Sequence, residues 1–87
     1  MNKSQFQKLG LFFKEKREAA GLTQLALSHK LKYGSKQIVS NWERGLCAPP
    51  LNKLARLVQI LDLNDREVIK IFLEETEKHL KQKLRKK

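Results

Sequence analysis

The stretch that decides the fold runs from Thr23 to Gly45 and reads TQLALSHKLKYGSKQIVSNWERG. Its pattern predicts two short helices joined by a turn at residues 32–34. Thr23 is a good N-cap for the first helix, and Gly45 ends the second because glycine adopts the left-handed conformation without a steric cost. Gly34 is expected to permit the sharp turn, and Ser35 is expected to cap the second helix.

The flanking sequence predicts three further helices. Residues 5–20 follow a possible N-cap at Ser4, and their apolar side chains recur at helical steps. Pro50 suits the first turn of a fourth helix, and Asn64 opens a fifth helix over residues 65–84. The expected fold class is therefore all-α, a compact five-helix domain with a long C-terminal helix.

The same helical steps predict which side chains face the core. These are Phe6, Leu9, Phe13, Arg17 and Ala20, then Leu27, Leu31, Val39 and Trp42, then Leu54, Leu57, Val58 and Leu61. Phe12 lies off this stripe, so it either covers a neighbouring groove or is exposed.

The chain is strongly basic for its 87 residues, with 19 Lys and Arg against 9 Asp and Glu and a net charge of +10. Such a balance on one small domain favours an anionic partner, with nucleic acid first. No apolar run is long enough for a signal peptide or a membrane span, so no membrane association is expected. A single cysteine, Cys47, fits a reducing cytoplasm.

Metal and catalytic chemistry are not supported by the pattern. Cys47, His29 and His79 lack ligand spacing, so no metal site is expected. Ser28 and His29 are neighbours on a helix and face different directions, which excludes a nucleophile–base pair. No glycine-rich phosphate loop is present, so no cofactor is expected and an enzyme is the least favoured class.

Three segments together resemble a known family. They are TQLALSHKL at 23–31, SKQIVSNWERG at 35–45, and Pro49 followed five residues later by Leu54. They resemble the phage-repressor family of helix-turn-helix proteins, the lambda-repressor-like fold that includes Cro and the xenobiotic-response-element regulators. The resemblance covers residues 8–62. The spacing from Thr23 to Trp42 is one residue longer than the family's, and we place the extra residue in the turn.

This resemblance implies that the helix at 35–44 enters the major groove of DNA. Its base-reading residues would be Lys36, Gln37, Ser40 and Asn41. Lysine donates to guanine O6 and N7, whereas glutamine and asparagine match adenine N6 and N7. Ser40 could touch a base, a phosphate or only water, and the alternative for the others is a solvated polar side chain.

The expected phosphate contacts are Gln24, Ser35, Arg44, Lys30, Lys32 and Tyr33. The resemblance implies that Gln24 bonds a phosphate and braces the reading helix. Tyr33 could reach a phosphate or sugar, or cover the edge of the core. The resemblance also implies a structural ion pair between Arg17 and Glu43, away from the DNA.

The fifth helix lies outside the resemblance, which divides the chain into a helix-turn-helix domain at 1–63 and a C-terminal helix at 64–87. Ile69, Leu73, Thr76 and Leu80 follow a short coiled-coil-like rhythm. Ile69, Phe72, Leu73 and Leu80 are therefore the expected dimerisation residues. The basic tail at 78–87 is either a solvated helix end, an arm on the DNA backbone, or the end of a dimerisation helix.

Together, these features predict a sequence-specific regulator that binds double-stranded DNA. The expected form is a repressor that binds a pseudo-palindromic operator as a homodimer. The alternatives are an antitoxin whose fifth helix binds a toxin, and a non-specific architectural binder driven by charge. A toxin or an antirepressor is the small protein partner that the chain could have.

Overall fold

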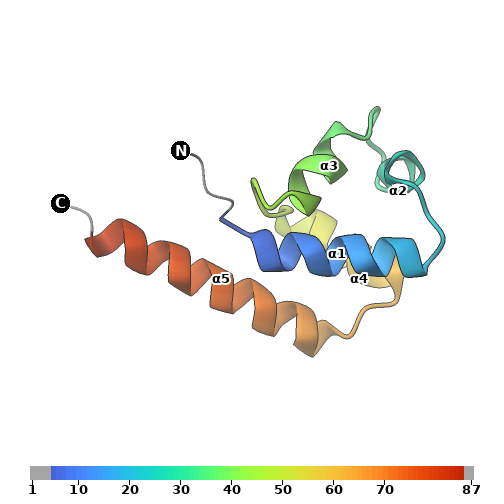
Figure 1. Cartoon of the computed structure of the whole chain (residues 1–87). Helices are drawn as coiled ribbons and strands as arrows, with labels where there is room; N and C mark the ends of the chain where they lie inside the picture. Colours follow the sequence, from blue (N-terminus) through green and yellow to red (C-terminus); the bar gives the residue numbers. More distant parts are fainter. Residues whose placement is uncertain (1–4, 86–87) are drawn as a thin grey trace.

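The computed structural model describes residues 5–85, and within that range the chain forms five helices and no strand (Figure 1). The helices are α1 Gln7–Ala19, α2 Gln24–Lys30, α3 Gln37–Glu43, α4 Leu51–Leu61 and α5 Asp65–Arg85. The all-α, five-helix class is thus confirmed. The possible cap Ser4 and the tail residues Lys86 and Lys87 lie outside the described residues. Among residues 5–85, none of the helices has the length and hydropathy of a membrane span.

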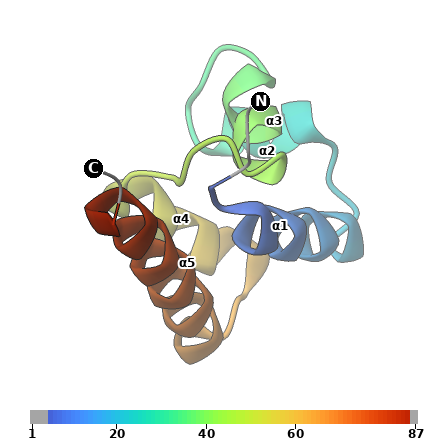
Figure 2. The same ribbon diagram turned by 60° about the vertical axis from the view of Figure 1, so that its left-hand side comes forward.

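The α1 helix is central and contacts α3 on one side and α5 on another (Figures 1 and 2). The core side chains are Leu9, Phe12, Phe13, Leu27, Leu31, Val39, Trp42, Leu57, Leu61, Leu63 and Val68. Phe12 is buried, which decides between the two alternatives for it. Ala20 is exposed and its expected core position was wrong, because α1 ends at Ala19 and Ala20 begins the turn toward α2.

Within two residues of its end, each of the first four helices is followed by a residue with a positive φ angle. These residues are Gly21, Lys32, Gly45 and Asp62. In the turn between α2 and α3 the left-handed residue is Lys32, with φ 69°, and Tyr33 N–H donates to Ser28 O over 2.9 Å. The turn role expected of Gly34 was therefore wrong: the reversal occurs two residues earlier, at the residue that follows the C-cap Leu31 of α2.

Three of the expected N-caps lie within the described residues, and two of these are confirmed. Thr23 Oγ1 accepts a hydrogen bond from Ala26 N–H at 3.0 Å, and Asn64 Oδ1 accepts one from Glu67 N–H at 3.1 Å. Ser35 is not the N-cap of α3, because the longer turn continues through the next residue and the helix begins at Gln37. The Ser35 hydroxyl still accepts from the Gln37 N–H at 3.3 Å.

The α1 and α3 helices approach closely where Gly10 lies. A Cβ atom built at Gly10 would stand 2.5 Å from the backbone oxygens of both Trp42 and Glu43. A side chain of any size would thus collide with the last turn of α3. Glycine is needed at position 10 for this packing, and it fixes how α3 sits on the body of the domain.

The start of α1 is capped from α5. Phe6, the N-cap residue of α1, supplies no side-chain hydrogen bond to the helix. Instead, Glu75 Oε1 accepts from Leu9 N–H at 2.8 Å, and Glu75 is only 9% exposed. The Phe6 ring also stacks on Phe72, with ring centroids 6.2 Å apart. The α5 helix is therefore fixed to the N-terminal end of α1.

Replacing Glu75 with alanine is expected to lower the free energy of unfolding by about 1–2 kcal/mol, the usual cost of losing a helix cap. Urea denaturation would measure it. Glu74→Ala is the matched control, because Glu74 is half-exposed and pairs only loosely with Lys8, at 3.9 Å. That pair should contribute about 0–1 kcal/mol. Equal losses in the two variants would contradict a capping role for Glu75.

Candidate nucleic-acid interface

The α3 helix has one buried and one open face. Val39 and Trp42 belong to the core, at 1% and 2% exposure. Gln37 is exposed and Asn41 is half-exposed, one turn apart on the opposite side. Ser40 is half-buried beside them, and Lys36 is exposed as the residue before the first turn. All four expected base-reading residues therefore lie on or beside α3, at differing depths.

The open face carries a hydrogen-bonded row of polar side chains. Gln37 Nε2 donates to Asn41 Oδ1 at 3.0 Å. The Arg44 guanidinium donates to the same Asn41 oxygen, also at 3.0 Å. We call Gln37, Asn41 and Arg44 the α3 row. Its members stabilise one another's rotamers, so the row is organised before any ligand arrives.

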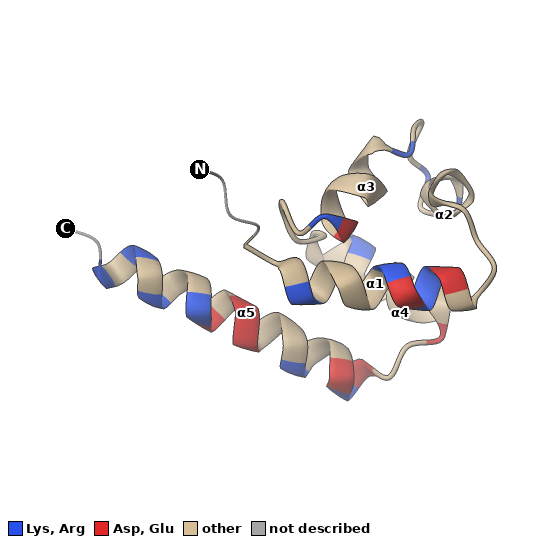
Figure 3. Cartoon of the chain, in the orientation of Figure 1, with Lys and Arg blue, Asp and Glu red and all other residues tan. Residues whose placement is uncertain are grey.

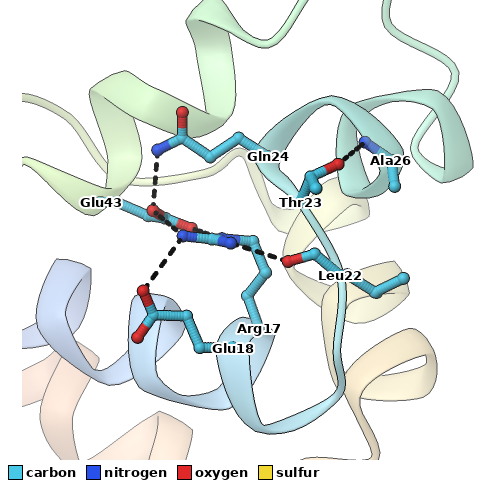
Figure 4. Close-up of polar contacts among 7 residues, drawn as sticks. All are labelled: Arg17, Glu18, Leu22, Thr23, Gln24, Ala26 and Glu43. Carbon is cyan, nitrogen blue, oxygen red and sulfur yellow. Dashed lines mark hydrogen bonds and ion pairs between the residues drawn. The ribbon is translucent and has the colours of Figure 1, made fainter.

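Behind α3, Arg17 and Glu43 form a bidentate ion pair (Figure 4). Arg17 Nε lies 2.6 Å from Glu43 Oε2, and one terminal nitrogen lies 3.1 Å from Oε1. The other terminal nitrogen donates to Leu22 O at 2.7 Å. Gln24 Nε2 donates to Glu43 Oε1 at 2.9 Å. This network joins α1, the start of α2 and the end of α3, and it uses one N–H of the Gln24 amide.

The hydrogen bond to Glu43 raises the pKa of Arg17, outweighing the opposite effect of burial. A raised pKa on a cation means that its stabilising effect is complete below the ordinary value and is lost only as the pH climbs through the raised one. Because arginine already titrates far above neutrality, the Arg17 side of the pair stays charged throughout the working pH range.

A hollow of about 640 Å³ opens between the start of α2 and the turn before α3. It is lined by Arg17, Thr23, Gln24, Leu25, Gly34, Ser35 and Lys36. The hollow brings Gln24, Ser35 and Lys36 together, although the sequence separates the first from the others by a full helix. Its walls therefore carry an amide, a hydroxyl and an ammonium group, all of which can donate hydrogen bonds.

The turn before α3 is held from α4 by a residue that the sequence did not single out. Lys53 Nζ donates to Leu31 O at 2.8 Å and lies 4.8 Å from the centre of the Tyr33 ring. The Tyr33 ring packs edge-on against Trp42, with centroids 5.9 Å apart. Tyr33 is half-buried, so it covers the edge of the core; its contact with phosphate stays a prediction. No local pattern marks Lys53, because its partners are far away in the sequence.

Four exposed cations lie at the ends of α3 and on the α2 helix and turn that precede it. Lys30, Lys32, Lys36 and Arg44 are all exposed, on α2, on the turn and at the two ends of α3 (Figure 3). A second basic region occupies the last turns of α5, where Lys78, Lys81, Lys83 and Arg85 follow the acidic middle of that helix (Figure 3). Two groups of exposed cations therefore lie near α3 and at the C-terminal end of α5, and further Lys and Arg residues lie on α1, α4 and the first half of α5.

The α5 helix leaves an apolar stripe uncovered. Ile69, Leu73 and Leu80 are 52%, 59% and 52% exposed. Phe72, expected beside them, is instead half-buried against Phe6. The pairing role of these residues stays a prediction, and the exposed three are the ones left open for it.

Among residues 5–85, no group of three or more His, Cys, Asp or Glu side chains could hold a metal ion. Cys47 is half-buried, and His79 packs its ring toward Phe6 at 6.3 Å.

Comparison with known proteins supplies the family. The model of a helix-turn-helix domain family matches residues 8–69. The chain belongs to this helix-turn-helix family. The match runs past residue 62 into the first turn of α5. No curated protein and no solved structure gives a significant match. In this helix-turn-helix protein, the family and the open polar face of α3 agree on DNA as the partner.

Proposed function

We propose that this protein is a sequence-specific transcription regulator of the phage-repressor type. It binds double-stranded DNA with α3 in the major groove and acts as a repressor. The observation that carries the proposal is the α3 row, a pre-organised line of amide and guanidinium groups opposite a buried face. Amide side chains in the major groove discriminate among base pairs, whereas charge alone does not.

Phosphate contacts would orient the reading helix. The hollow between α2 and α3 offers donors from Gln24, Ser35 and Lys36 to one DNA strand. Lys30 and Lys32 lie exposed nearby, and Tyr33 borders them. Binding should weaken with salt by a log–log slope of about −0.9 for each phosphate neutralised.

The protein would act as a homodimer through α5. Its exposed stripe continues into a hollow of about 370 Å³ between α4 and α5. The apolar walls of that hollow are Leu51, Leu54, Ala55, Val58, Val68 and Ile69. Covering this surface with a second copy would remove it from water and place two reading helices at once. On a pseudo-palindromic operator, the half-sites would stand about 34 Å apart.

The function is tested by selecting binding sites from random double-stranded DNA. A motif with two inverted half-sites is expected. A flat distribution of sequences would sink sequence-specific regulation and favour an architectural binder.

Gln37→Ala is expected to cost about 1–3 kcal/mol of binding free energy and to relax preference at one base pair of each half-site. Gln37 is exposed, so the fold should be unaffected. The matched control is Lys30→Ala, which should weaken all sequences about equally and lower the salt slope by about 0.9. Titrations against cognate and scrambled DNA would measure both. If Gln37→Ala also weakens binding to every DNA sequence equally, Gln37 does not read a base.

Leu73→Glu is expected to shift the dimer to monomers, because Leu73 is exposed in the protomer and a charge there opposes an apolar interface. Gln82→Glu, an exposed α5 position off the stripe, is the control. Sedimentation equilibrium would show the shift. A dimer unchanged by Leu73→Glu would remove the stripe from the dimer interface.

The antitoxin alternative rests on the same stripe, since a toxin could cover it instead of a second copy. A wild-type chain that stays monomeric, yet selects a DNA motif, would favour that alternative.

A further inference from the structure

The hydrogen bonds within the α3 row determine which way the amide groups of Gln37 and Asn41 are turned. Gln37 and Arg44 both donate to one atom, the Asn41 Oδ1, over equal distances of 3.0 Å. An amide can face a neighbour with its oxygen or with its nitrogen, and the chemistry of the neighbour decides which. Arginine has five donors and no acceptor, so the Asn41 atom facing Arg44 must be the oxygen.

The polarity of Gln37 follows in turn. Because the same Asn41 oxygen accepts its bond, Gln37 must face Asn41 with its amide nitrogen. A carbonyl oxygen has two lone pairs, and here two donors occupy them. The NH₂ group of Asn41 therefore points away from both partners. Asn41 can present only hydrogen-bond donors to a DNA base. Gln37 uses one N–H in the row and keeps the other, together with its carbonyl oxygen.

These two amides consequently suit different bases. Adenine presents an acceptor at N7 and a donor at N6, so it needs a mixed pair such as the one Gln37 keeps. Guanine presents two acceptors, N7 and O6, and is the purine that fits a group with donors only. The N6 amino group of adenine would face the NH₂ group of Asn41, and because both groups are donors, no hydrogen bond could form between them.

We propose that Arg44 is a specificity-determining residue that positions Asn41 to select guanine over adenine. This inference rests on the proposed function, since it requires α3 to read base edges. Arg44 acts through Asn41 and need not touch the base. It revises the expectation from sequence that both amides match adenine and that Arg44 serves only phosphate.

The test is selection from random double-stranded DNA by the 87-residue chain and four variants, one of which is the Gln37→Ala variant described above. Asn41→Ala identifies the base pair that Asn41 reads, as the position where preference disappears. At that position the wild type should select guanine. Arg44→Met keeps the stem but removes the donors, so Asn41 can rotate. The adenine-to-guanine ratio there should rise by about tenfold, the smaller end of what a bidentate contact discriminates.

Asn41→Asp gives an independent outcome. The carboxylate keeps an acceptor for Gln37 and Arg44 but replaces the outward NH₂ with an oxygen. Preference should pass from guanine to cytosine, whose N4 amino group donates. Arg44 is exposed and Asn41 half-exposed, and thermal unfolding of each variant would confirm that the fold is kept.

The inference is overturned if the wild type selects adenine at the Asn41 position, or if Arg44→Met weakens all sequences equally. It is also overturned if Asn41→Ala changes no preference while Gln37→Ala does; the proposed function would then survive. Loss of all preference in the wild type would instead sink the proposed function itself.

Discussion

Replacing Glu43 with alanine is expected to lower the free energy of unfolding by about 3–5 kcal/mol, the cost of leaving one partner of a buried ion pair uncompensated. Arg17 and Glu43 are 8% and 7% exposed, so the stranded guanidinium cannot regain its hydration without opening the structure. The total free energy of unfolding of a small natural domain is only about 5–15 kcal/mol. The variant should therefore be close to unfolding at room temperature, as urea denaturation would show.

The chain offers a matched control on the same arginine. Glu18 also approaches Arg17, at 3.9 Å, but its side chain is 58% exposed. Glu18→Ala should change the free energy of unfolding by about 0–1 kcal/mol. The double variant Arg17→Met/Glu43→Leu should recover much of the loss, because apolar replacements of a buried pair are often neutral. If Glu43→Ala costs no more than Glu18→Ala, the pair does not hold α1 to α3.

Replacing Gly10 with alanine is expected to lower the free energy of unfolding by about 2–3 kcal/mol. Overpacking costs roughly 1–3 kcal/mol and sometimes more. The larger values apply here because the obstructing atoms are the backbone oxygens of Trp42 and Glu43, 2.5 Å from the new Cβ. Alanine also gains up to about 1 kcal/mol of helix propensity over glycine, which offsets part of the loss. Thermal and urea unfolding would measure the difference.

Gly34→Ala is the control for this change. A Cβ at Gly34 meets nothing within 4 Å, and its φ angle is not positive. Alanine there should be neutral or stabilise by about 0.4–1 kcal/mol, by restricting the unfolded chain. A Gly10→Ala variant as stable as Gly34→Ala would mean that α1 and α3 can separate without cost.

Signals confined to a few neighbouring residues predicted the fold well. The five helices, the caps at Thr23 and Asn64 and the stop at Gly45 all depend on local hydrogen bonds. The turn before α3 was the local failure. There the left-handed conformation falls on Lys32, which has no intrinsic preference for it, and the choice is stabilised by Lys53 from another helix.

Contacts between distant residues could not be predicted from local patterns; the Arg17–Glu43 pair was expected only because the family resemblance implies it. Glu75 caps α1 across 66 residues, and nothing in the spacing of α5 distinguishes it from Glu74. The close approach at Gly10 depends on where α3 lies in space, which no periodicity describes.

In the candidate site too, the features set by local helix geometry were predictable and those set by particular side-chain contacts were not. Helical spacing was enough to put Gln37 and Asn41 on one side of α3, because that geometry is a property of the helix. The polarity of their amides was not predictable, since it depends on a hydrogen bond from Arg44 to a particular atom. The proposed preference for guanine over adenine therefore depends on a side-chain contact that the sequence pattern does not specify.

The Glu75 cap has a consequence for how the molecule unfolds. Because a residue of α5 completes the first turn of α1, the C-terminal helix cannot detach without fraying the N-terminal one. The chain should melt in a single transition, and hydrogen exchange in α1 and in the first half of α5 should slow or quicken together. A fragment cut after residue 64 would lack part of what holds the helix-turn-helix body together, so loss of the proposed dimer could not be told from unfolding in that fragment. Single substitutions at Ile69, Leu73 or Leu80 on the exposed stripe would test pairing without removing the Glu75 cap.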